Sequence, residues 1–225
     1  DMVSRGLGDV YKRQIFILII LIIMEESNFI TNAWKTCLEI LTDRGYTPDE
    51  TYFKLNAKEL DFLAQKNSLD IVAKDETRKK FICVKFILTE KVKSAYVKEL
   101  VNEIKDKIPI DHTYEMIFVL KNKPNSTLKK LEKDRDLGDI QIRSCKELQF
   151  NITKHVLVPQ HIKLTDDEVK AIMNRYSIHS KTQLPLILRE DPIVRYYNFK
   201  SGDVLKIPTS NGSLNSSYVN YRCVR

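Results

Sequence analysis

The chain has 225 residues, of which 43% are hydrophobic and 30% charged, with a formal net charge of +7. That composition is typical of a globular protein with one large domain or two small ones. Its four cysteines form no C-x-x-C pair, which excludes a paired-cysteine zinc or redox motif and favours buried free thiols in a reducing compartment.

The N-terminus conflicts with that compartment. Lys12 and Arg13 precede the apolar run Ile15–Met24, as in a signal peptide, and N-x-S/T sequons occur at Asn125, Asn151, Asn211 and Asn215. The run is too short to span a bilayer, and no small-residue cleavage site follows it. We interpret residues 1–23 as a non-native leader, because "DMVSRGLGDVYKRQ" resembles translated sequencing-adapter and the apolar run resembles an untranslated region read in frame. Met24 would then be the start.

The first part of the chain alternates helical and strand-like segments. Apolar residues recur at helical spacing from Ser27 to Asp43, with Gly45 as a C-cap, and Thr47–Glu50 resembles the capped start of a second helix. The later segments are two strands ("LDIVAK", "KKFICVKF"), a helix (Val92–Ile108), a strand ("YEMIFVL"), a loop ("KNKPNS"), a short helix (Thr127–Asp134) and a strand ("GDIQIRS"). This alternation predicts an α/β domain with a mixed sheet over residues 24–149.

The character of the chain changes near Phe150. A capped helix from Thr165 to Tyr176 with an acidic first turn, a proline-broken stretch and the strand-like tail "SYVNYRCVR" predict a small second domain over residues 150–225. This part carries 11 basic and 6 acidic residues, a net charge of +5. The excess suits nucleic acid or an acidic protein partner, and charge alone does not choose between them.

One arrangement suggests a nuclease. Asp70 begins the "LDIVAK" strand, and Cys83-Val84-Lys85 lies on the next strand, where nucleases of the restriction-endonuclease type carry acid-x-Lys. Cys83 stands where the second Mg²⁺-binding carboxylate is required, so the pattern indicates an inactive relative or an ordinary charged strand edge. The histidines form no zinc-ligand spacing, and no phosphate-binding glycine motif occurs. We therefore predict no catalytic residue, no metal and no cofactor.

The loop "KNKPNS" is the better binding candidate. Lys121, Asn122, Lys123 and Ser126 are suited to sequence-independent contact with phosphates, and Pro124 stiffens the turn that carries them. A solvated turn is the alternative.

The final segment carries a resemblance to a known family. The motifs that carry it run in the family's order over residues 150–225: His155, Leu157-Val158-Pro159, His161, Gln183-Leu184-Pro185, Asp191-Pro192, Arg195-Tyr196, Gly202, Val204, Lys206-Ile207 and Tyr221-Arg222. In these motifs the chain resembles the fifth subunit shared by the eukaryotic nuclear RNA polymerases, whose archaeal equivalent is the short C-terminal domain alone. Residues 24–149 resemble the family's N-terminal jaw more loosely, through the Trp34 helix that ends in "DRGY".

The resemblance implies an α+β fold: an N-terminal α/β jaw with a mixed sheet and a restriction-endonuclease-like core, and a small α+β C-terminal assembly domain. It implies a non-catalytic subunit of DNA-directed RNA polymerase that docks on the largest subunit, beside neighbouring small subunits. It places the "KNKPNS" loop beside downstream double-stranded DNA. No membrane or small-molecule partner is implied.

The resemblance also marks the residues expected at the partner interface or in its structural motif. They are His155, Pro159, His161, Gln183, Leu184, Pro185, Asp191, Pro192, Arg195, Tyr196, Tyr221 and Arg222. The family pattern has Gly, Ala and Gly where this chain has Glu190, Val194 and Asn198, and its Thr-Ala-Gly loop is replaced by "TSNGSLNSS". These departures indicate a divergent member, from a protist or a large DNA virus. We expect a nuclear location for a cellular protein, and a host-cell cytoplasmic factory or the virion for a viral one.

Overall fold

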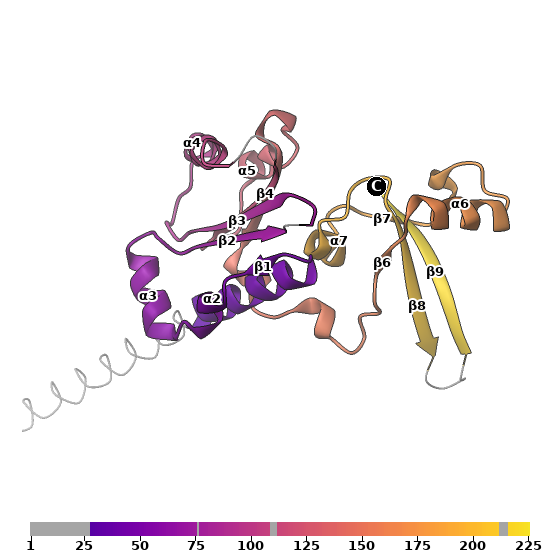
Figure 1. Cartoon of the computed structure of the whole chain (residues 1–225), viewed down its shortest axis with the longest axis horizontal. Coiled ribbons are helices and arrows are strands. Elements are labelled where there is room, and N and C mark those ends of the chain that lie inside the picture. Colours follow the sequence, from indigo (N-terminus) through magenta and orange to yellow (C-terminus); the bar gives the residue numbers. More distant parts are fainter. Residues whose placement is uncertain (1–27, 76, 109–111, 212–215) are drawn as a thin grey trace, which may run out of the picture. The chain divides into compact units, whose positions relative to one another are not determined.

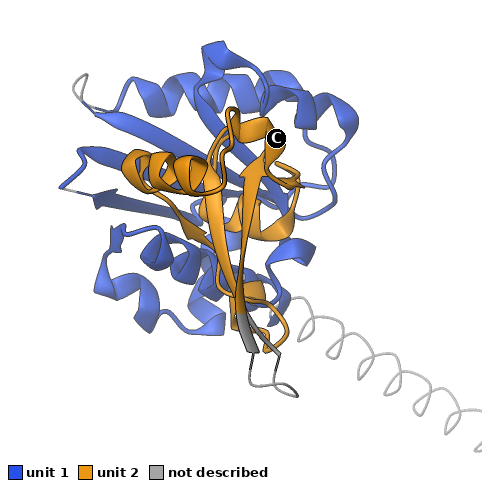
Figure 2. Ribbon diagram, turned by 90° about the vertical axis from the view of Figure 1, so that its right-hand side faces the viewer, with its two compact units in different colours: residues 1–150 blue, residues 151–225 orange. Residues whose placement is uncertain are grey.

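The chain folds into two compact units in the computed structural model, which describes residues 28–75, 77–108, 112–211 and 216–225. The units are Asp1–Phe150 (unit 1) and Asn151–Arg225 (unit 2), and Figure 2 shows them in blue and orange. The division falls beside the boundary predicted between residues 149 and 150. The predicted leader, residues 1–23, lies outside the described residues. Among the described helices, none combines the length and apolar character that a membrane crossing requires.

Unit 1 is built on a mixed sheet. Its strands stand in the order β1 (Thr47–Pro48), β2 (Asp70–Asp75), β3 (Lys80–Ile87), β4 (Thr113–Leu120) and β5 (Asp139–Ser144). The pairs β1–β2 and β2–β3 are antiparallel, whereas β3–β4 and β4–β5 are parallel. The prediction of an α+β chain with a mixed sheet is therefore confirmed. Because β3 and β4 run in the same direction, the loops that follow them meet at one edge of the sheet.

Helices cover both faces of this sheet (Figure 1). On one face α4 (Ser94–Lys105) and α5 (Ser126–Leu131) bury apolar residues against β4 and β5. On the other face lie the helix over residues 28–43, α2 (Glu50–Lys54) and α3 (Ala57–Gln65). Trp34 anchors this second face, since its ring lies 5.8 Å from that of Phe86. Two 3-10 turns, η1 (Arg135–Leu137) and η2 (Cys145–Leu148), flank β5.

The predicted cap of the second helix was wrong in position. Thr47 and Pro48 form β1, which pairs with β2 opposite Lys74 and Ala73, and Asp49 is the residue that caps α2. The helix α3 was not predicted, although Asn56 and Glu59 form a capping box at its start.

A buried polar cluster joins the end of the 28–43 helix to the sheet. Arg44 donates to Glu115 Oε2 at 3.0 Å and to Gln141 Oε1 at 2.8 Å, so it connects the helix to β4 and β5. Burial lowers the pKa of Arg44, while the carboxylate of Glu115 opposes that shift. Gly45 follows with φ +85°, and a side chain there would collide with Arg78. The "DRGY" segment therefore attaches the end of this helix firmly to the sheet.

Unit 2 has its own sheet, in the order β6 (Ile162–Lys163), β8 (Val204–Asn211), β9 (Ser216–Val224) and β7 (Leu186–Ile187). Its other elements are η3 (Ile152–Lys154), α6 (Asp166–Arg175), η4 (Lys181–Gln183) and α7 (Pro192–Tyr197). Thr165 and Glu168 form a capping box at the start of α6, and the backbone hydrogen bond from Thr165 lowers the pKa of Glu168. The predicted acidic helix start lies at this position.

The hairpin β8–β9 is longer than its neighbours. The short β6 pairs with β8 only at Leu205 and Lys206, and β7 pairs with β9 only at Cys223 and Val224. Beyond these pairs β8 and β9 continue as a two-stranded ribbon, paired with each other as far as Asn211 and Ser216 (Figure 1).

Two of the four sequons are used inside the fold. The Asn125 side chain caps α5 by accepting from Leu128 N at 2.8 Å. The Asn151 side chain donates to Tyr196 Oη at 2.8 Å and accepts from Thr153 N at 2.9 Å. A glycan on the Asn151 amide nitrogen would disrupt its bond to Tyr196, which is buried. The side chains of Asn211 and Asn215 lie outside the described residues.

Candidate nucleic-acid loop and subunit interface

The predicted DNA-contact loop follows β4 directly. Lys121 N donates to Ile87 O at 3.3 Å, which fastens the start of the loop to the end of the parallel neighbour β3. Pro124 is buried, and Asn125 caps the helix α5 that follows. The loop is therefore held at both ends, and Lys123 and Ser126 are exposed to solvent from a fixed backbone.

A carboxylate that was not predicted lies against the loop. Glu90, in the connection between β3 and α4, has its Oε1 atom 3.3 Å from Lys121 Nζ. Asn122 Nδ2 donates to Glu90 Oε2 at 3.2 Å. The pairing was missed because the residues are far apart in sequence and are brought together only by the parallel β3–β4 pair.

A hollow of about 320 Å³ lies between the two loops. It is lined by Thr89, Glu90, Lys91, Val92, Leu120, Asn122, Lys123, Asn125 and Leu128. Two of the predicted contact residues, Asn122 and Lys123, line this hollow, and Lys121 is joined to its rim through Glu90. Ser126 starts α5 and is not part of the lining.

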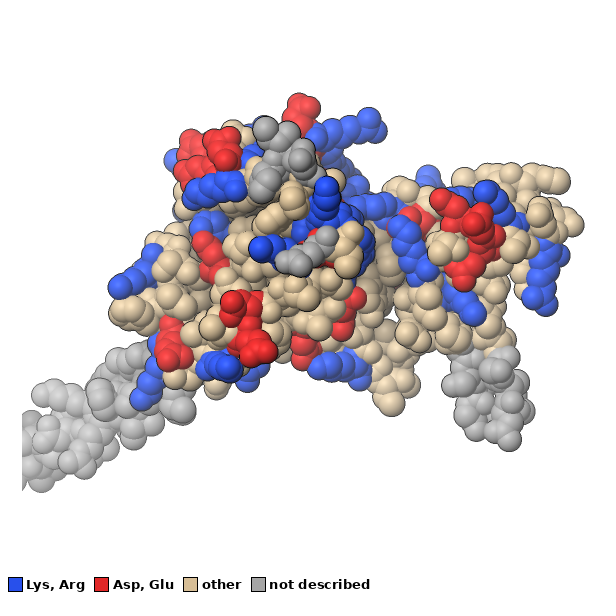
Figure 3. All heavy atoms as spheres, in the orientation of Figure 1, with Lys and Arg blue, Asp and Glu red and all other residues tan. Residues whose placement is uncertain are grey.

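Further lysines follow the loop. Lys129 and Lys130 are exposed in the last turn of α5, and Lys91 is exposed on the opposite loop. The sequence pattern indicated only a short polar helix over residues 127–134 and did not single out these lysines. Basic and acidic side chains are interspersed over the face of unit 1 that Figure 3 shows. The 121–126 loop and α5 therefore offer a local group of lysines to phosphates.

The nuclease-like pattern forms an ion pair. Lys85 Nζ lies 2.8 Å from Asp70 Oδ2, and Cys83 lies two residues before Lys85 on the same strand. Burial, assisted by the charge of Asp70, raises the pKa of Cys83 to about 11, so this thiol stays protonated at neutral pH. No group of three His, Cys, Asp or Glu side chains within the described residues could hold a metal ion. This arrangement does not support the nuclease alternative.

In unit 2, two predicted histidines hold a loop that exposes apolar side chains. His155 Nδ1 accepts from Leu157 N at 3.2 Å, and His161 Nδ1 lies 2.8 Å from Pro159 O. Between them Val156 is 94% exposed and Leu157 is 80% exposed. Burying a Val or Leu side chain is worth about 1.5–3 kcal/mol, so this loop gains stability when a partner covers it.

Several other predicted interface residues form hydrogen bonds or pack within unit 2. Gln183 Oε1 accepts from His179 N and Ser180 N, and Leu184 is buried in the core beside α6. The carbonyl of Pro185 accepts from Cys223 N at 2.9 Å. Leu184 is buried, whereas Gln183 and Pro185 are exposed.

The sequence predicts that Pro185 and Pro192 fix two turns, which Asp191 and Arg195 would tie together, but the Asp-Pro motif instead starts a helix. Asp191 accepts from the N–H groups of Ile193 and Val194, and Pro192 occupies the first turn of α7. Arg195 lies in the last turn and is half-buried.

The aromatic residues of α7 pack inside unit 2. Tyr196 is only 2% exposed and accepts a hydrogen bond from Asn151. Tyr197 lies edge-on to Tyr196 and stacks on Phe199 with ring centroids 5.2 Å apart. The ring of Tyr196 is therefore enclosed within unit 2 and is not exposed to a ligand.

The departures from the family pattern are accommodated by the backbone. Asn198 ends α7 with φ 56°, in the left-handed region that Gly and Asn adopt most readily. Glu190 lies in a turn closed by Asp191 N and Leu188 O, and it has no positive φ. Val194 is buried.

The last two predicted interface residues lie on β9. Tyr221 is half-buried and its ring centroid lies 6.2 Å from that of Tyr176. Arg222 donates to Leu186 O at 3.1 Å and so fastens β9 to the short strand β7. Unit 2 also exposes large apolar side chains that the list of expected interface residues does not contain. They include Val156, Leu157, Ile162, Leu186, Leu188, Tyr218 and Val219.

The C-terminal part of the chain matches a known protein family. Residues 150–224 match the family described as RNA polymerase Rpb5, C-terminal domain. The chain is 32% identical over 208 residues to DNA-directed RNA polymerase V subunit 5A of Arabidopsis thaliana, covering 89% of this chain and 90% of that protein. It is 31% identical over 205 residues to DNA-directed RNA polymerases I, II, and III subunit rpabc1 of Dictyostelium discoideum, covering 89% of this chain and 100% of that protein.

A viral relative is also similar. The chain is 30% identical over 178 residues to a candidate DNA-directed RNA polymerase subunit, 454R, of Invertebrate iridescent virus 6. That similarity covers 74% of this chain and 87% of the viral protein.

Proposed function

The chain belongs to the family of the fifth subunit of DNA-directed RNA polymerase, and we propose that it acts in the polymerase without catalytic residues of its own, through one surface on each unit. Unit 2 docks on the largest subunit, beside neighbouring small subunits. Unit 1 faces downstream double-stranded DNA. The relation of unit 1 to the restriction-endonuclease core is part of this proposal.

The loop between His155 and His161 carries the docking proposal. Val156 and Leu157 are the most exposed large apolar side chains among the described residues, and two histidines hold the backbone that presents them. An apolar pair kept in water by a fixed loop costs free energy in the free subunit, and that cost is removed when a partner covers it.

The lysines near the 121–126 loop support the DNA contact. Lys123, Lys129 and Lys130 are exposed on a backbone held by Pro124 and Asn125. Ammonium groups in such a position neutralise phosphates without reading base edges, which suits a surface that DNA of any sequence passes.

The location follows the polymerase that the subunit joins. The relatives named above include plant and amoebal subunits and a viral protein. We assign the nucleus if the chain is cellular, and a cytoplasmic factory or the virion if it is viral.

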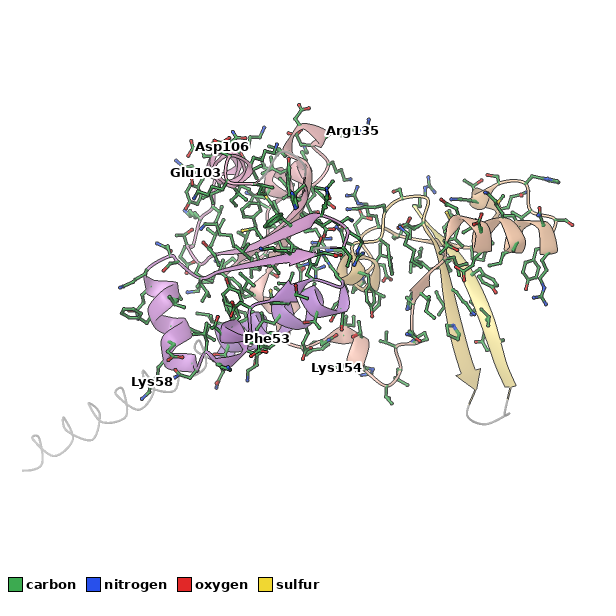
Figure 4. All side chains as sticks on the ribbon, viewed as in Figure 1. Phe53, Lys58, Glu103, Asp106, Arg135 and Lys154 are labelled. Atoms are coloured by element: carbon green, nitrogen blue, oxygen red, sulfur yellow. The ribbon has the colours of Figure 1, made fainter. Side chains whose placement is uncertain are left out.

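Capture of the largest polymerase subunit by the full chain tests this function. Val156→Asp with Leu157→Asp places two charges on the exposed loop without touching the core, and we expect it to abolish capture. Phe53→Asp with Phe62→Asp, on α2 and α3 of unit 1, is the control with the same number of added charges and should capture normally (Figure 4 labels Phe53). Equal capture by both variants would exclude the 155–161 loop from the interface.

A further inference from the structure

We propose that Glu90 holds Lys121 and Asn122 and competes with DNA phosphates for them, so that it lowers the affinity of this loop for DNA. The inference rests on the proposed DNA contact of unit 1. It assigns a role to a residue of the opposite loop that carries the same sign of charge as DNA.

The two oxygens of the Glu90 carboxylate contact two different residues of the predicted DNA-contact loop. Glu90 Oε1 lies 3.3 Å from Lys121 Nζ, and Glu90 Oε2 accepts from Asn122 Nδ2 at 3.2 Å. The carbonyl of Glu90 lies 3.5 Å from the same amide nitrogen. Each carboxylate oxygen therefore occupies a donor that a phosphate oxygen would use.

The pairing is delivered by the fold. Glu90 lies in the connection that leaves β3, and Lys121 is the first residue after β4. The bond from Lys121 N to Ile87 O ties these strand ends together, and Glu90 and Asn122 both line the hollow. Glu90 is therefore beside Lys121 whenever unit 1 is folded.

The pair is open to exchange with solvent and ions. The side chain of Glu90 is 74% exposed and that of Lys121 is 38% exposed. Exposed ion pairs of this kind change an equilibrium by about two- to fivefold, which weakens a phosphate contact without abolishing it. The negative charge of Glu90 also repels a phosphate that approaches Lys121.

A weak grip suits a surface along which DNA moves. Each phosphate must leave the loop before the next one can arrive, and a lysine that already has a carboxylate partner releases it more readily. Lys123, Lys129 and Lys130 are exposed beside this pair and supply the steady attraction.

Fluorescence anisotropy of the full chain with a short labelled duplex tests the inference across a salt series. The variants are Glu90→Gln, Lys121→Gln and the two together, with Glu103→Gln as the charge-matched control on the outer side of α4 (Figure 4). We expect Glu90→Gln to tighten binding about two- to fivefold at low salt and to steepen the salt dependence by up to about 0.9. When Lys121→Gln is already present, adding Glu90→Gln should raise the DNA affinity only as much as Glu103→Gln does.

The outcomes separate this inference from the proposed function. If Lys121→Gln weakens binding but Glu90→Gln behaves like Glu103→Gln, the role of Glu90 is overturned and the DNA contact stands. A gain from Glu90→Gln that persists unchanged without Lys121 overturns the competition for Lys121, because Glu90 would then act through Asn122 or through net charge alone. If Lys121→Gln leaves both affinity and salt dependence unchanged, the contribution of Lys121 to the DNA contact fails and the inference fails with it.

Discussion

Lys85 Nζ lies 2.8 Å from Asp70 Oδ2, and the two residues are direct partners across the antiparallel β2–β3 pair. The lysine and the acid that a nuclease would arrange around a metal ion thus form a cross-strand ion pair with each other. Val72, two residues along β2, stands opposite Cys83, so a thiol occupies the position of the second carboxylate.

This relationship predicts that the purified chain does not cleave DNA. Supercoiled plasmid incubated with the chain and Mg²⁺ should stay intact on an agarose gel, as it does with Asp70→Ala. Nicking by the parent chain that Asp70→Ala removes would instead assign catalysis to this pair and contradict a purely structural subunit.

The loop lysines should govern DNA affinity. We expect Lys121→Ala with Lys123→Ala to weaken duplex binding and to lower the salt slope by about 0.9 for each phosphate that is no longer neutralised. Lys35→Ala with Lys58→Ala, which removes two exposed lysines from the helices on the other face of the sheet, should change the slope less. Identical slopes for the two double variants would remove the loop from the DNA contact.

The stability of the chain should depend on whether the residue at position 198, where α7 ends, can adopt a positive φ. Because its φ is 56°, Asn198→Gly should keep or raise stability, whereas Asn198→Val should lower the free energy of unfolding by about 1–2 kcal/mol. Urea unfolding followed by circular dichroism measures both. A Gly variant as unstable as the Val variant would show that the Asn side chain, rather than its conformation, holds this position.

The thiols should be unreactive in the native chain. Burial raises the pKa of Cys37 and Cys145 to about 12, that of Cys83 to about 11, and that of Cys223 above its usual value. We expect little reaction with DTNB at about pH 8, where an exposed thiol of pKa about 8.5 reacts readily. All four free cysteines should react in guanidinium chloride. Rapid native reaction of one thiol, located by mass spectrometry, would contradict this.

The carboxylate of Asp75 should make unit 1 sensitive to acid. Hydrogen bonds from the Thr77 hydroxyl and from the backbone and side chain of Arg78 hold the pKa of Asp75 below its usual value. A depressed pKa stabilises the fold above the unfolded value of about 3.9, and that contribution is lost as pH falls through the folded pKa.

The Tm difference between the parent chain and Asp75→Asn is the measure. It should be largest near neutral pH and should shrink as the solution is acidified below about pH 4. Asp106→Asn, which removes an exposed carboxylate at the end of α4, is the control for the loss of one surface charge (Figure 4). A constant difference for Asp75→Asn would assign its effect to packing.

Sequence pattern predicted most of the elements and failed at particular ones. The strands around Ile71, Val84 and Phe118 were found because apolar residues in them alternate or run together. The helix α7 was missed because Pro192 suggested a turn, although Asp191 caps the helix directly before a first-turn proline.

The candidate sites were less predictable than the fold for a physical reason. Residues such as Gln183, Leu184 and Tyr196 stand out in a motif, yet they are buried or bonded within unit 2. The partners that determine a site, such as Glu90 for Lys121, meet only through strand pairing. Periodicity reports which side of an element is buried, and it carries no information on which distant side chain lies opposite.

The ribbon of β8 and β9 has a consequence for a subunit that has not been assembled. Past Lys206 and before Cys223, each of these strands has one edge to which no other strand of the described structure is bonded. Open edges accept strands from other molecules, and Tyr218 and Val219 add apolar surface there. Excess copies made without a polymerase to join would therefore associate with each other, and a cell that makes this protein needs to match its synthesis to that of its partners.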